Sequence, residues 1–150
     1  MICVDTNVIC YRCTASPHSK NADAAWAKDS DWIAPLLWRS EFGNTLAEAL
    51  RRRLLTTEKA IQIANLAESI LAENEFTVST SAVLQLVSRS RCSAYDCEFV
   101  ALAEEQRVPL VTLDRQILHD FPRIAVSLQE FIREWSPARC DRRRAQLRCG

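Results

Sequence analysis

Residues 1–7 read Met-Ile-Cys-Val-Asp-Thr-Asn, an apolar run that stops abruptly at an acid. The apolar residues predict a short buried strand, and Asp5-Thr6-Asn7 is typical of the cap that begins a helix. The same pattern returns at residues 110–114, which read Leu-Val-Thr-Leu-Asp. The β-branched residues there again predict a buried strand with an acid at its carboxyl end. The chain therefore contains two units in which a predicted strand ends at an acid, one at its start and one at residues 110–114.

Strand and helix signals alternate through the rest of the sequence. Further strands are expected at 32–35, 76–78 and 124–126. Helical periodicity or capping signals predict helices over 21–28, around the repeat of Leu46, Leu50 and Leu54, over 57–71, 82–87, 93–106, 115–119 and 128–135, with a loop over 17–21. This alternation predicts an α/β domain with a mostly parallel sheet, in which ligands bind beyond the carboxyl ends of the strands.

Length and composition favour one ordinary globular domain. The chain has 150 residues, of which 48% are hydrophobic and 25% charged, so it has enough apolar surface to build a core. No run approaches the roughly 18 apolar residues of a membrane span, and Asp5 interrupts the start of any signal-peptide core. We therefore expect a cytoplasmic protein. With only two glycines, Gly43 and Gly150, a glycine-rich phosphate loop is excluded.

The net charge of zero hides an uneven distribution. The stretch 139–150 holds five arginines and one aspartate and carries +4, so residues 1–138 carry −4. A nucleic-acid partner would therefore meet a local basic rim and not a basic body. We place the domain at 1–135 and a basic tail at 136–150. Disorder, electrostatic RNA binding and an added extension all stay open as explanations of that tail.

The seven cysteines indicate reduced thiols and not a disulfide framework. Their number is odd, and the chain is long enough to fold without cross-links. Cys10 and Cys13 have C-x-x-C spacing, with Cys3 and His18 nearby, but no second ligand pair follows to complete a zinc site. We expect these thiols to be buried and apolar in character.

Four acids are candidates for one cleft. If the strands before Asp5 and Asp114 are neighbours, both carboxylates face the same crevice. Glu41 shares a helix face with Leu37 and Trp38 and so calls for a partner. Asp96 lies in the first turn of its helix, on the same side of the sheet.

Each of these acids also has a purely structural explanation. Asp5 and Asp114 are suitable helix N-caps, which stabilise a helix by about 1 kcal/mol, and Ser93 with Asp96 matches a capping box. Glu41 is compatible with an ordinary helix surface. Convergence, however, has a cost, because two carboxylates about 5 Å apart repel by roughly 3 kcal/mol at an effective dielectric near 20. A divalent cation removes that repulsion.

The motifs resemble those of the PIN-domain family, and among its members the small VapC-type toxins of bacterial toxin–antitoxin modules. The resemblance runs from Met1 to about Trp135 and rests on four short motifs in the right order: Val4-Asp5-Thr6-Asn7, Ser40-Glu41, Ser93-Ala94-Tyr95-Asp96 with Val100-Ala101-Leu102-Ala103, and Leu110-Val111-Thr112-Leu113-Asp114.

This resemblance implies a single domain with a central five-stranded parallel sheet flanked by helices on both faces. It implies an endoribonuclease that uses Mg²⁺ or Mn²⁺. The catalytic and metal-holding residues would be Asp5, Glu41, Asp96 and Asp114, with Thr6, Asn7 and Thr112 supporting them. It also implies an antitoxin partner that covers the acidic cleft, and a homodimer. Hydrolysis by a metal-activated water would leave 5′-phosphate and 3′-hydroxyl ends.

Arginines near the acidic motifs are candidates for RNA contacts. Arg12, Arg51 and Arg115 carry this prediction, because such cations position phosphates without reading sequence. For the run Arg51-Arg52-Arg53, a solvated helix end that complements the helix dipole explains the charge equally well.

Two other functional classes stay open. One is a PIN-like module that binds RNA or protein without catalysis. The other is an acidic-cleft phosphatase with a strand-end aspartate as nucleophile, although that class calls for a second aspartate where this chain has Asn7. A receiver-like signalling domain fits less well, since Asp5 has no adjacent acid and no lysine follows Lys59.

Overall fold

The computed structural model describes residues 1–134, and its sheet has five parallel strands. They are β1 Ile2–Val4, β2 Trp32–Pro35, β3 Glu75–Phe76, β4 Leu110–Thr112 and β5 Ala125–Ser127. Across the sheet their order is β3-β2-β1-β4-β5. The chain first builds outward from β1 on one side and then returns to build on the other. The order therefore reverses between β1 and β4, the two strands that precede Asp5 and Asp114.

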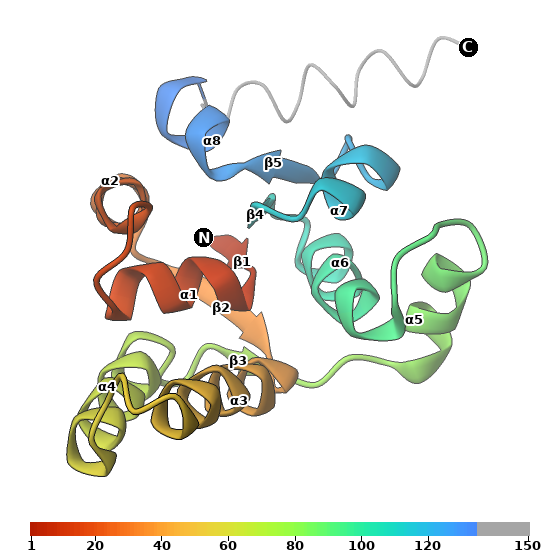
Figure 1. The fold of residues 1–150 in the computed structure, drawn as a ribbon. Helices are drawn as coiled ribbons and strands as arrows, with labels where there is room; N and C mark the ends of the chain where they lie inside the picture. The colour runs from red at the N-terminus through yellow and green to blue at the C-terminus, as the bar shows by residue number, and fades with distance from the viewer. Residues whose placement is uncertain (135–150) are drawn as a thin grey trace, which may run out of the picture.

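Helices cover both faces of this sheet, as predicted. Within residues 1–134 they are α1 Thr6–Cys13, α2 Ser19–Lys28, α3 Leu37–Arg51, α4 Thr57–Ile70, α5 Thr80–Val87, α6 Ala94–Gln106, α7 Arg115–Asp120 and α8 Leu128–Glu134. Figure 1 shows α1 and α2 on one side of the strands and α5 and α6 on the other. The expected single α/β domain with a five-stranded parallel sheet is confirmed.

The core lies on both faces of β1, β2 and β4. All residues of β1 and β4 are buried, as continuous apolar runs in a parallel sheet require. Helix α6 packs against β1, β2 and β4 and is in turn covered by α5. Its residues from Phe99 to Ala103 are therefore buried. Because α6 is held so firmly, the acid in its first turn has a fixed place relative to the strand ends.

Several boundaries differ from the prediction. Helix α2 begins at Ser19, inside the expected loop, and β3 pairs only at Glu75–Phe76, two residues that lie at the sheet edge. The helix predicted from the leucine repeat ends at Arg51, so Leu54 lies beyond it and is 65% exposed. The left-handed backbone of Arg53, with φ of 56°, turns the chain before the next helix.

The cysteine prediction is confirmed for the described residues. Cys3, Cys10, Cys92 and Cys97 are buried, Cys13 is half-buried, and all five are free thiols. The domain boundary at residue 135 and the basic tail 136–150 lie outside the described residues. None of the helices within residues 1–134 has the length and apolar character that crossing a membrane requires.

A matched pair of leucines tests the placement of the core. Leu102 on α6 is completely buried, whereas Leu84 on α5 is 58% exposed. We expect Leu102→Ala to lower the free energy of unfolding by about 3 kcal/mol, because it removes buried methyl groups and leaves a cavity. Leu84→Ala should change it by less than about 0.5 kcal/mol. Urea denaturation measures both, and equal losses would contradict this packing.

Candidate active site

The carboxyl ends of β1 and β4 form the centre of the candidate site. The two strands pair with Val4 opposite Val111, and the Asp5 backbone N–H donates to the Val111 carbonyl over 3.1 Å. Asp5 follows β1 directly, and Asp114 follows β4 after one residue. The reversal of strand order thus brings these two acids to the edge of the sheet where α/β proteins bind their ligands.

Thr112 links the two acids. Its hydroxyl donates to Asp5 Oδ2 over 2.7 Å and accepts the backbone N–H of Asp114 over 2.9 Å. Thr112 and Asp5 are both buried. Asp5 stands at the N-cap position of α1, yet its side chain makes no capping hydrogen bond. The carboxylate of Asp5 therefore accepts its hydrogen bond from Thr112, across the strands, and faces the site.

Glu41 reaches the site from the next strand along the sheet. It lies on α3, which follows β2, and its side chain is half-buried. The hydroxyl of Thr6, the residue after Asp5, donates to Glu41 Oε2 over 2.5 Å. The two predicted supporting threonines therefore each orient one acid of the site: Thr112 orients Asp5, and Thr6 orients Glu41.

Asp96 and Asp114 do cap their helices, but each uses one oxygen for it. Asp96 Oδ2 accepts the backbone N–H and the hydroxyl of Ser93, which completes a capping box. Asp114 Oδ1 accepts the backbone N–H groups of Gln116 and Ile117, over 2.7 and 2.9 Å. Within residues 1–134 the other oxygen of each carboxylate makes no hydrogen bond, so capping and ligand binding are compatible.

The charges of the four acids act on one another. The pKa of Asp5 is raised to about 6, chiefly by burial and in smaller part by the negative charges of Glu41 and Asp114, against the lowering effect of the Thr112 hydrogen bond. Burial also raises the pKa of Glu41, and Asp96 adds to that rise. Asp5 therefore interacts with Glu41 and Asp114, and Glu41 interacts with Asp96. The four acids are therefore linked in pairs, as a chain of interacting charges.

Glu98 is a fifth acid that the sequence analysis missed. It lies on α6, is half-buried, and its charge also raises the pKa of Glu41. Burial raises the pKa of Glu98 itself. Residues two apart on a helix point in different directions, so its spacing from Asp96 gave no signal. The only available signal was its position between Cys97 and Phe99, which are both buried.

The oxygen donors suit a hard divalent cation with a partly retained water shell. Among residues 1–134, no three His, Cys, Asp or Glu side chains stand close enough to ligate one ion together. A cation bound there would therefore contact at most two of the four carboxylates directly, and the others would reach it only through its waters, as is usual for Mg²⁺. The zinc alternative at Cys10 and Cys13 is incomplete as well, because no third His, Cys, Asp or Glu among residues 1–134 stands close enough to join them.

The remaining predicted site residues lie in different surroundings. Asn7 is exposed, although its backbone lowers the pKa of Asp5. The guanidinium of Arg12 pairs with Asp23 over 3.4 Å and lies over the ring of Trp26 at 5.6 Å, so it joins α1 to α2. Arg51 and Arg115 are exposed, and neither forms an ion pair within the described part of the chain.

Comparison with known proteins identifies the fold family. The PIN domain profile matches residues 2–126. The chain belongs to the PIN domain family. No curated protein sequence matches it. PIN domains are generally nucleases and typically use divalent metals, which agrees with an acidic site of oxygen donors.

Two solved structures share the fold of this PIN domain. FitAcB from Neisseria gonorrhoeae superposes with a TM-score of 0.66 at 21% identity, over 86% of this chain and 99% of that one. PAE2754 from Pyrobaculum aerophilum superposes with a TM-score of 0.66 at 20% identity, over 97% of both chains.

The raised pKa of Asp5 predicts that neutralising it stabilises the metal-free protein. The fold favours the protonated acid, so wild-type stability falls as the pH rises from about 4 through about 6 and the loss is complete above that range. A pKa of about 6 against 3.8 corresponds to on the order of 3 kcal/mol. Asp5→Asn should be more stable than wild type by this amount at pH 8 and nearly equal to it at pH 4, in urea denaturation with EDTA.

The control for this experiment is Glu105→Gln. Glu105 is exposed on the last turns of α6, so its neutralisation should leave stability unchanged at both pH values. If Asp5→Asn were no more stable than wild type at pH 8, burial and repulsion would not act on Asp5 as described.

Proposed function

We propose that this protein is a metal-dependent endoribonuclease and the toxin of a type II toxin–antitoxin pair. It would hydrolyse RNA phosphodiester bonds with a water activated among Asp5, Glu41, Asp96 and Asp114. One observation carries the proposal: four carboxylates from β1, α3, α6 and the end of β4 interact at the reversal of strand order, where an α/β sheet binds its ligand. Membership of a family of nucleases supports the reaction class.

Mg²⁺ or Mn²⁺ is the proposed cofactor. Asp5, Glu41, Asp96 and Asp114 would hold it, either directly or through its waters, since each is an oxygen donor placed by a hydrogen bond on its other side. When bound, the ion lowers the pKa of a water, orients it for in-line attack and stabilises the charge on the leaving oxygen.

The protein's own residues would prepare this reaction. Thr112 and Thr6 hold the carboxylates of Asp5 and Glu41 in fixed orientations, so little reorganisation is needed when substrate binds. Glu41, whose pKa is raised by burial and by Asp96, is suited to accept a proton from the attacking water. Water, and not a side chain, would be the nucleophile; its oxygen would bond to phosphorus as the P–O3′ bond breaks, so the products would carry 5′-phosphate and 3′-hydroxyl ends.

The proposed partners follow the same reasoning. RNA phosphates would meet Arg115, next to Asp114, and Arg51 at the end of α3, both of which are exposed. Arg12, already paired with Asp23, is the least available of the three predicted cations. An antitoxin would cover the acidic cleft with a basic side chain, and the chain would act as a homodimer in the cytoplasm.

Cleavage of total cellular RNA tests this proposal directly. Purified protein with Mg²⁺ or Mn²⁺ should give discrete products with 5′-phosphate ends, and EDTA should abolish them. Asp5→Ala should lower the rate by at least about 100-fold, because it removes a carboxylate at the centre of the site. Wild-type cleavage that persists in EDTA would contradict the metal mechanism. Activity in Asp5→Ala equal to wild type would favour a non-catalytic role for the fold.

We expect the substitution Thr112→Val to shift the pH dependence of RNA cleavage. The Thr112 hydroxyl lowers the pKa of Asp5, so its loss should raise that pKa by about one unit, the equivalent of one hydrogen bond. At subsaturating Mg²⁺ the acidic limb of the pH–rate profile should move to higher pH, with most activity retained at pH 8.5. Thr112→Ser keeps the hydroxyl and serves as the control. An unshifted profile in Thr112→Val would show that this bond does not set the ionisation of Asp5.

A further inference from the structure

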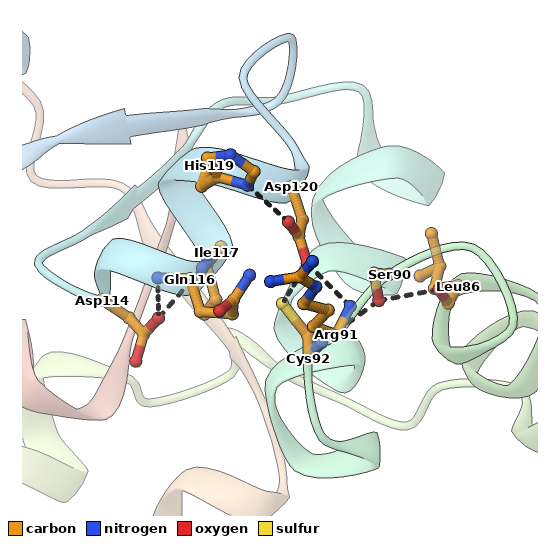
Figure 2. Close-up of polar contacts among 9 residues, drawn as sticks. All are labelled: Leu86, Ser90, Arg91, Cys92, Asp114, Gln116, Ile117, His119 and Asp120. Atoms are coloured by element: carbon orange, nitrogen blue, oxygen red, sulfur yellow. Dashed lines mark hydrogen bonds and ion pairs between the residues drawn. The ribbon is translucent and has the colours of Figure 1, made fainter.

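Asp120, at the end of α7, connects two parts of the chain that each carry an acid of the site. Its Oδ2 accepts the backbone N–H of Arg91 over 2.7 Å and lies 3.9 Å from the thiol of Cys92 (Figure 2). Its Oδ1 accepts Nδ1–H of His119 over 2.7 Å. Only 10% of the Asp120 side chain is exposed, whereas His119 is 80% exposed. The carboxylate is thus directed inward, onto the backbone that leads into α6.

The connection continues from Asp120 to Asp114. The side chain of Gln116 lies near Asp120 and contributes to the low pKa of that acid. The backbone N–H of the same Gln116 donates to Asp114 Oδ1 over 2.7 Å. Figure 2 shows Gln116 between Asp114 and the stretch that holds Arg91 and Cys92. Asp114 and Asp120 therefore stand at the two ends of the short helix α7, with Gln116 between them.

The connection also continues in the other direction, to Asp96. Arg91 and Cys92 directly precede Ser93, which donates its backbone N–H and its hydroxyl to Asp96 Oδ2. The loop is fixed from its other side by Ser90, whose hydroxyl donates to the Leu86 carbonyl over 2.9 Å and accepts the Cys92 N–H over 3.3 Å. Hydrogen bonds therefore connect Asp120 to the loop that holds Asp96 in place, and the short helix α7 connects Asp120 to Asp114.

We propose that Asp120 is a positioning residue, which sets the separation of Asp96 and Asp114 by holding the start of α6 against α7. The inference rests on the proposed function, since it concerns the metal and RNA chemistry of those acids. Asp96 lies on α6, which precedes β4 in the chain, and Asp114 caps α7, which follows β4. The side chain of Asp120, at the end of α7, accepts a hydrogen bond from the loop that leads into α6. Residues that orient metal-holding side chains in this way commonly change metal affinity by 10- to 100-fold when substituted.

A carboxylate suits this place better than an amide would. Each oxygen of Asp120 accepts a hydrogen bond from an N–H group. Because an ionised carboxylate has only acceptors, neither N–H group faces another donor. The hydrogen bond to His119, followed by that to Arg91, lowers the pKa of Asp120 to about 2, so the side chain stays ionised at every pH at which RNA cleavage is measured. An asparagine would present its NH₂ group to one of these donors.

The test compares Asp120→Ala and Asp120→Asn with the charge-matched control Glu105→Gln in the full-length protein. The readouts are the Mn²⁺ dissociation constant by titration calorimetry, kcat and KM for an RNA substrate, thermal melting, and hydrogen exchange of the Arg91 amide. Asp120→Ala should weaken Mn²⁺ binding and lower kcat by about tenfold each, with the KM for RNA changed less than about twofold. Asp120→Asn should fall between it and wild type, because its remaining oxygen still accepts one bond.

These measurements separate positioning from general stability. Faster exchange of the Arg91 amide together with wild-type Mn²⁺ affinity and kcat would overturn the inference, since the bond would exist without positioning the acids. If Asp120→Ala does not fold, Asp120→Asn decides, and wild-type Mn²⁺ affinity in that variant overturns the inference. A wild-type protein that binds Mn²⁺ but cleaves no RNA would overturn the proposed function alone, because weaker Mn²⁺ binding by Asp120→Ala would still support the role of Asp120.

Discussion

Burial of a carboxylate beside other carboxylates, at the carboxyl end of β1, is the constraint on which the rest of the site depends. Asp5 is buried and lies near two other negative charges, so its pKa is raised to about 6. The hydroxyl of Thr112 offsets part of that cost and also fixes the backbone of Asp114. The hydroxyl of Thr6 offsets part of the corresponding cost for Glu41 by donating a hydrogen bond to its carboxylate. The surrounding fold tolerates this unfavourable cluster because the strands beneath it are completely buried.

Helix capping and site chemistry share the same side chains in this protein. Asp114 caps α7, and Asp96 closes the capping box of α6 with Ser93; each uses one oxygen for this, and the other oxygen remains for a ligand. A capping role is therefore a means of placing an acid and not an alternative to function. Asp120 extends this principle one step outward, since it joins the two capped helix starts through Arg91 and Gln116.

The sequence contained most of the architecture because it depends on local patterns. Buried apolar runs before Asp5 and Asp114, and the capping box at Ser93, specify elements without reference to the rest of the chain. Strand order, in contrast, is set by tertiary packing, which places β1 beside β4 although more than 100 residues separate them in the chain. Glu98 and Asp120 could not be predicted from the sequence for the same reason, because their partners, Glu41 and Arg91, are distant in sequence. Arg12 resembled a phosphate contact, but Asp23 and Trp26 lie next to it in the fold.

The central claim is that the four carboxylates form one binding site for a divalent cation. Anomalous diffraction from a crystal grown with Mn²⁺ tests it most directly, because the method locates the ion without reference to activity. We predict a peak among Asp5, Glu41, Asp96 and Asp114, with a carboxylate oxygen about 2.1 Å from the ion. The claim would be contradicted by a peak elsewhere in the protein. It would also be contradicted if no peak appeared at saturating Mn²⁺ while the four side chains kept the positions described above.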